Sequence, residues 1–145
     1  MSDSKEDDSF DQKEVSLLTQ DNKSIEAKLL IYEESPENPE LVQIGIISEF
    51  FSGEKTGEDF FSVLCEIRKE LENQGLRIKC YGASRNVYPS GMSRSMGYGE
   101  KAYKLTIGKQ AKMQDLVSIF DDGQDVIPVN INEQESFFDQ WAKSL

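Results

Sequence analysis

The chain has 145 residues, enough for one domain with a substantial core. Its 27 acidic and 16 basic residues give a formal net charge of −11, which disfavours binding to nucleic acid or to an anionic membrane. The chain has no histidine, which excludes Ser-His-Asp and Cys-His catalytic systems, and only two cysteines, too few for a four-cysteine metal site. We therefore expect no cofactor and no metal ion, and we favour a binding function over an enzymatic one.

The N-terminal segment is polar and acidic. Residues 1–12 contain a single aromatic residue, Phe10, and too little apolar surface to offset the entropy of ordering. We therefore predict a disordered acidic tail over 1–12 and a single domain over 13–145. The segment has no basic region followed by an apolar stretch, and no apolar run in the chain is long enough to cross a bilayer. These features predict a cytoplasmic protein that does not bind membranes.

Two alternating segments follow the tail. Residues 26–33 place Ala27, Leu29 and Ile31 on one face, and residues 41–48 alternate in the same way. The stretch between them contains two prolines, which cannot donate hydrogen bonds to a strand ladder. This pattern predicts an antiparallel hairpin with a loop longer than the tightest turns.

A central helix is predicted over residues 58–73. Apolar side chains recur there at steps of three and four residues, at Phe60, Leu64, Ile67 and Leu71. Thr56 is the predicted N-cap, and Gly75 is placed to end the helix. Cys65 and Cys80 lie in apolar-patterned segments, which favours buried free thiols over a disulfide or a redox pair.

Four further segments have strand-like patterns. Residues 76–82 and 102–108 alternate apolar and polar side chains, which predicts two strands. Residues 113–121 fit either one face of a helix or the first strand of a hairpin with residues 126–131. We slightly favour the hairpin, with Pro128 confining its second strand to a sheet edge.

A short C-terminal helix completes the predicted elements. Asn132 and Glu135 have the spacing of a capping box. An apolar stripe follows at Phe137, Phe138, Trp141 and Leu145. The order of elements shows no regular alternation of strand and helix, so we expect an α+β fold: a mostly antiparallel sheet packed against one long central helix and a short C-terminal helix.

The charge is unevenly distributed along the chain. Residues 77–112 contain eight basic residues and one acidic residue, a net charge of +7. The other stretches are acidic, with −8 over 1–40, −4 over 41–76 and −6 over 113–145. The total of −11 therefore conceals one basic block in an acidic chain.

Part of the basic block is an unusually long loop, residues 82–99, rich in glycine and serine and free of acidic residues. Its candidate binding residues are Arg85, Tyr88, Ser93, Arg94, Gly97, Tyr98 and Gly99. Guanidinium groups and glycine amides match the oxygens of a small anion, although neither a P-loop nor a dinucleotide-binding pattern is present. Two other interpretations stay open: a solvated loop whose arginines contact the protein's own carboxylates, and a contact surface for a partner protein.

Charge and the missing catalytic residues lead to one principal hypothesis. We expect a small acidic interaction protein that binds and neutralises or regulates a basic protein partner, as a bacterial immunity protein blocks a toxin nuclease. The alternative is a domain that binds a small anion or a nucleotide through the loop 82–99. RNA binding by the basic and aromatic residues around that loop is a third possibility, which the net charge disfavours. A specific site is expected either on the loop or on an acidic surface away from it.

Overall fold

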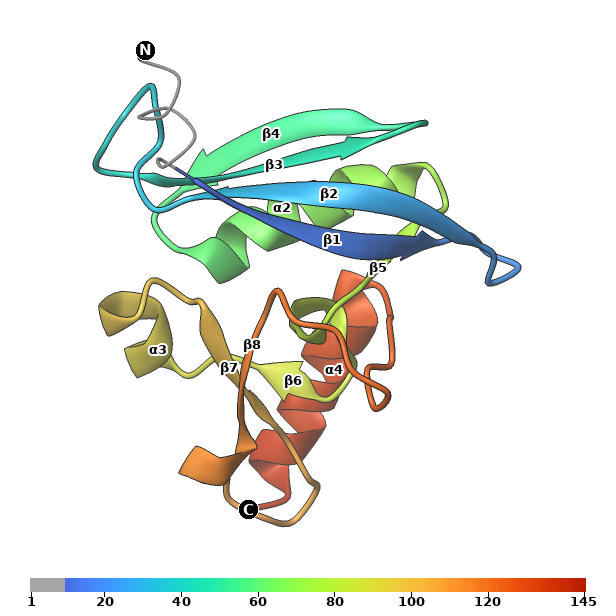
Figure 1. Cartoon of the computed structure of the whole chain (residues 1–145). Helices are drawn as coiled ribbons and strands as arrows, with labels where there is room; N and C mark the ends of the chain where they lie inside the picture. Colours follow the sequence, from blue (N-terminus) through green and yellow to red (C-terminus); the bar gives the residue numbers. More distant parts are fainter. Residues whose placement is uncertain (1–9) are drawn as a thin grey trace.

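The N-terminal half of the chain builds a five-stranded antiparallel sheet in the computed structural model, which describes residues 10–145 (Figure 1). The strands are β1 (Asp11–Leu18), β2 (Ser24–Tyr32), β3 (Val42–Ser48), β4 (Ser52–Gly57) and β5 (Arg77–Lys79). Across the sheet they follow the order β4-β3-β2-β1-β5. The predicted hairpin is confirmed, because β2 and β3 are antiparallel neighbours.

The sequence analysis missed the first strand. Residues 1–9 of the predicted tail lie outside the described residues, but Asp11 and Gln12 pair with Ile31 and Leu30 of β2. Only two residues of β1, Val15 and Leu17, are buried, and the others are exposed or half-buried. Such a strand is held by its neighbours' hydrogen bonds and packing more than by its own composition.

Helix α2 (Phe60–Asn73) covers the inner face of this sheet. Leu64 and Leu71 are fully buried against strand residues such as Leu29 and Ile44, and each buried side chain of this size contributes about 2 kcal/mol. The predicted helix is confirmed, but its N-cap is wrong. Asp59 accepts a hydrogen bond from the Ser62 amide at 2.8 Å. Thr56, the predicted cap, instead pairs with Gln43 in the β3–β4 ladder.

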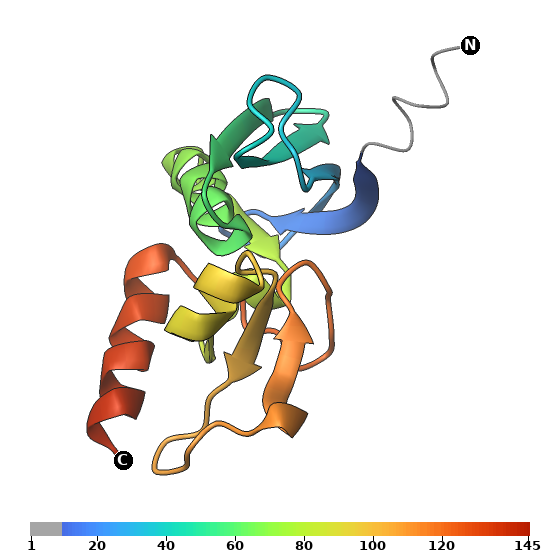
Figure 2. The same cartoon turned by 90° about the vertical axis from the view of Figure 1, so that its left-hand side faces the viewer.

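The C-terminal half forms a smaller layer below the first sheet (Figure 1). Strands β6 (Val87–Tyr88), β7 (Lys101–Lys104) and β8 (Leu116–Ser118) form a second antiparallel sheet, with β7 in the centre. The short helix α3 (Gly91–Met96) joins β6 to β7, and helix α4 (Ile131–Lys143) packs against α2 and β6. Figure 2 shows α4 below α2 on the same side of the molecule.

Two predictions about the C-terminal third need correction. Residues 113–121 form a single 3-10 turn followed by β8, which pairs with β7 and not with residues 126–131. The latter stretch forms no strand; Pro128 makes only an isolated bridge to Ser84. Helix α4 begins earlier than predicted, because its N-cap is Asn130 and not Asn132. The Asn130 Oδ1 atom accepts a hydrogen bond from the Glu133 amide at 2.8 Å.

The two sheets share one hydrophobic core. Ala102 and Ile119 from the C-terminal layer are fully buried in the same cluster as Leu17 and Ile78 from the first sheet. The structure is therefore the expected α+β fold, with one central and one C-terminal helix. Within residues 10–145, no helix combines the length and the apolar composition needed to cross a membrane.

Candidate functional site

The predicted binding loop, residues 82–99, is an ordered segment that includes β6 and α3. Its Arg94 side chain turns inward to the start of α2: Nη2 donates to Ser62 Oγ at 2.6 Å, and Nε lies 3.6 Å from Asp59 Oδ2. The guanidinium also lies over the Phe61 ring, 5.5 Å from its centroid. Arg94 thus contacts the protein's own carboxylate and hydroxyl groups.

The backbone amides of this loop are used internally as well. The Gly97 and Gly99 amides both donate to the Ser93 carbonyl at 2.9 Å, and the Ser93 amide donates to Ser90 Oγ at 3.0 Å. Tyr98 adopts a left-handed conformation, with φ of 56°, and its carbonyl accepts the Phe60 amide. The first three bonds hold the loop's own turn together, and the last joins the loop to the first residue of α2.

Arg85 and Tyr88 face α4. The Arg85 guanidinium lies over the Phe137 ring at 5.3 Å, while Tyr88 stacks on Phe138 at 4.2 Å and meets the edge of Phe61 at 5.1 Å. Burial raises the pKa of the Tyr88 hydroxyl above its ordinary value. Of the candidate residues, Arg94 and Tyr88 both contact Phe61, whereas Arg85 contacts Phe137 of α4.

Two lysines of the basic block 77–112 are paired with an acidic turn. Lys79 Nζ lies 2.6 Å from Asp122 Oδ1, and Lys104 Nζ lies 3.0 Å from Asp125 Oδ2. Tyr81 also donates to Asp125, at 2.6 Å. The predicted basic block is therefore neutralised in part by carboxylates that are more than twenty residues away in sequence.

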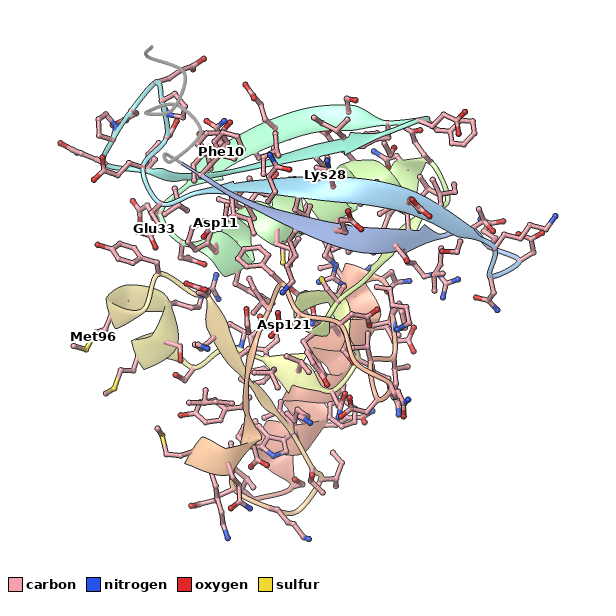
Figure 3. All side chains as sticks on the ribbon, in the orientation of Figure 1. Phe10, Asp11, Lys28, Glu33, Met96 and Asp121 are labelled. Atoms are coloured by element: carbon pink, nitrogen blue, oxygen red, sulfur yellow. The ribbon has the colours of Figure 1, made fainter. Side chains whose placement is uncertain are left out.

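Carboxylates remain unpaired on the outer face of the five-stranded sheet, which faces away from α2. A trough of about 540 Å³ lies there, and we call the surface that lines it the acidic sheet face. Its members are Glu14, Glu26, Lys28, Ile47 and Asp122, of which Asp122 is the carboxylate already paired with Lys79. Figure 3 labels Lys28 on this face. Lys28 lies opposite Glu14 in the strand register, but the two groups do not approach within ion-pair distance.

A glutamate-rich loop continues the negative charge beyond the sheet. Residues 33–40 connect β2 to β3 and contain four glutamates, none of which forms an ion pair with another described residue. Ser35 anchors this loop to the outer side of the sheet by donating to Gln43 Oε1 at 2.8 Å. Glu33 and Asp11 lie near the same end of the sheet (Figure 3).

The sequence analysis did not identify the acidic sheet face. Its signal is the alternation within β1, where the buried Val15 and Leu17 flank Ser16 and follow the exposed Glu14. Lys28 and Glu26 have the same parity in β2. Only the strand pairing shows that these separate stretches share one face.

The two cysteines are free thiols, as favoured by the sequence, but only Cys80 is fully buried, whereas Cys65 is half-buried. Burial raises the pKa of Cys80 to about 11 and also raises the pKa of Cys65, so both thiols are protonated at neutral pH and poorly nucleophilic. Across the described part of the chain, no three histidine, cysteine or carboxylate side chains are placed to hold a metal ion.

Comparison with known proteins gives no further assignment: no protein-family model matches the chain, and no curated protein is significantly similar to it.

Proposed function

We propose that this chain is a non-enzymatic interaction protein that binds a basic protein partner through the acidic sheet face. The proposal includes a cytoplasmic location, and an immunity protein that neutralises a toxin nuclease is an example of such a role. The observation that carries it is Ile47, which is 51% exposed in a trough bordered by Glu14 and Glu26.

This arrangement supports binding because an apolar centre with a charged border is a common composition of protein interfaces. Glu14 and Glu26 are exposed and form no ion pair within residues 10–145, so a partner's lysines or arginines would meet carboxylates that need not break existing pairs. The overall charge of −11 also accelerates the approach of a basic partner.

The anion-binding alternative stays a prediction, and no observation favours it over the first. An anion site on the loop would need Arg94 to leave Asp59 and Ser62, and it would need amides that now donate to the Ser93 carbonyl. Both changes cost hydrogen bonds that the free protein already makes.

The proposal is tested by affinity capture from the native host with two matched variants. Glu14→Lys combined with Glu26→Lys reverses the charge of the acidic sheet face. Glu133→Lys combined with Asp139→Lys makes the same charge change at exposed positions of α4. Both pairs are solvent-exposed, so neither is expected to unfold the protein.

We expect the wild type and the α4 variant to retain the same basic protein, and the sheet variant to lose it. Binding of that partner after purification should weaken by at least about tenfold in the sheet variant only. Equal retention by both variants, or a captured partner that is itself acidic, would contradict the proposal.

A further inference from the structure

A second surface lies at the opposite end of the molecule from the five-stranded sheet. It is an apolar groove of about 440 Å³ beside the C-terminal part of α4. The C-terminal end of α4 is in the lower part of Figure 1. We call it the aromatic groove. Its main walls are the side chains of Tyr88, Tyr103, Leu105, Phe138, Trp141 and Leu145. The groove shares no residue with the acidic sheet face.

The walls of the aromatic groove are fixed in the free protein. Tyr88 stacks on Phe138 with ring centroids 4.2 Å apart. Trp141 Nε1 donates to the Lys109 carbonyl at 2.8 Å, and the Gly108 amide donates to Ser144 Oγ at 2.8 Å. A ligand therefore meets a preformed surface and does not have to order it, which lowers the entropic cost of binding.

Unpaired lysines border one end of this groove. Lys109 and Lys112 line a neighbouring cavity, together with Asp115, that shares Gln110 with the groove. Lys143 lies between Trp141 and Leu145 in the sequence. All three lysines are exposed and form no ion pair with a described residue. Six other lysines are already paired with carboxylates.

The apolar surface extends past the groove itself. Leu145 is 57% exposed, and Met92, next to the groove-lining Gly91, is 70% exposed. Methionine is flexible and adapts to varied apolar partners. An apolar wall bordered by unpaired positive charge is complementary to a segment that carries both apolar and acidic side chains.

We propose that the aromatic groove binds an acidic peptide segment of a second protein, with a bulky apolar side chain in the groove and carboxylates beside Lys109 and Lys112. The overall negative charge does not prevent this, because charges more than about 8 Å away are largely screened at physiological salt. The protein then has two chemically opposite surfaces, one for a basic partner and one for an acidic segment.

Trp141 provides a direct readout, because it is the only tryptophan in the chain and lies in the groove wall. The probe is a synthetic peptide in which leucine and phenylalanine are interspersed with glutamate. Two comparison peptides replace the glutamates by lysine or the apolar residues by alanine. Each is titrated into the full-length protein while tryptophan emission is recorded.

We expect the first peptide to shift the Trp141 emission to shorter wavelength and both comparison peptides to bind at least about tenfold more weakly. Lys109→Glu combined with Lys112→Glu should weaken binding by a similar factor. The matched control, Lys23→Glu combined with Lys69→Glu, changes two exposed lysines that line neither the groove nor the acidic sheet face and should bind as the wild type does.

Three results would overturn the proposal: no emission change with the first peptide up to about 1 mM, equal binding of the lysine peptide, or wild-type binding by the Lys109/Lys112 variant. None of them bears on the acidic sheet face. The proposals for the two surfaces are therefore tested by separate experiments, and one can be wrong while the other is right.

Discussion

Gln134 is a fully buried polar residue that ties α4 to the rest of the core. Its Nε2 lies within hydrogen-bond distance of the carbonyls of Gly82, Ser84 and Val87, at 2.9 to 3.0 Å. Its Oε1 accepts from Arg68 at 2.6 Å, and Arg68 is itself only 2% exposed. Buried donors and acceptors are costly unless they are paired, so this group stabilises the contact between the two layers.

Replacing Gln134 with alanine is expected to lower the free energy of unfolding by about 2–4 kcal/mol. The substitution removes one of the three acceptors of the Arg68 guanidinium, takes the Gln134 donor away from the buried carbonyls of Ser84 and Val87, and opens a cavity. Urea unfolding followed by circular dichroism measures the effect. Gln140→Ala, at an exposed position of the same helix, is the matched control and should change stability by less than about 0.5 kcal/mol. Equal effects of the two substitutions would show that the buried network adds nothing.

Sequence could not identify this network in advance. Gln134 lies among polar residues in a segment that reads as a helix start, and nothing local marks it as buried. Its burial follows from where the loop carbonyls of residues 82–87 lie. Positions such as Leu64 and Leu71 were predictable because their spacing alone places them on the apolar face of a helix.

At the scale of elements, the loop 82–99 holds the N-terminus of α2. Gly99 has φ of 72°, and a Cβ there would lie 2.8 Å from Asp59 Oδ1 and 3.0 Å from the Phe61 amide nitrogen. The loop therefore approaches the helix cap more closely than any other residue type allows. This requirement explains why residue 99 is a glycine. From the sequence alone, the segment could not be distinguished from a flexible loop.

The substitution Gly99→Ala is expected to destabilise the protein by about 1–3 kcal/mol, because it combines left-handed backbone strain with a clash at the α2 cap. Thermal unfolding provides the measurement. Gly91→Ala is the matched control, since a Cβ at Gly91 meets no atom within 4 Å and its backbone is helical. A Gly99→Ala protein as stable as the Gly91→Ala protein would contradict this role for the loop.

Helices and strands whose apolar residues repeat at a regular spacing could be predicted from sequence. Strands that form only because they pair with a neighbouring strand could not. β2, β3 and α2 followed from apolar spacing. β4 has the sequence SGEKTG and no buried residue, and it is a strand because it pairs with β3 along its length. The predicted hairpin between residues 113–121 and 126–131 was wrong for a related reason, because β8 pairs with β7 instead.

At the scale of the whole molecule, folding redistributes the charge. The sequence showed a basic block within an acidic chain, and the fold pairs two lysines of that block, Lys79 and Lys104, with the turn that contains Asp122 and Asp125. Glu14 and Glu26 then remain unpaired on the acidic sheet face, while the unpaired Lys109 and Lys112 line a cavity next to the aromatic groove. Sequence could supply the charges but not this separation, because it depends on contacts between distant residues.

The central claim is that a basic partner binds the acidic sheet face, and the most direct test is calorimetric titration of the purified pair at increasing salt. From about 0.05 M to about 0.5 M NaCl, wild-type affinity should fall by at least about tenfold as the charges are screened. The Glu14→Lys, Glu26→Lys protein should bind weakly and lose this dependence. Equal affinity and an equal salt dependence for the two proteins would contradict the claim.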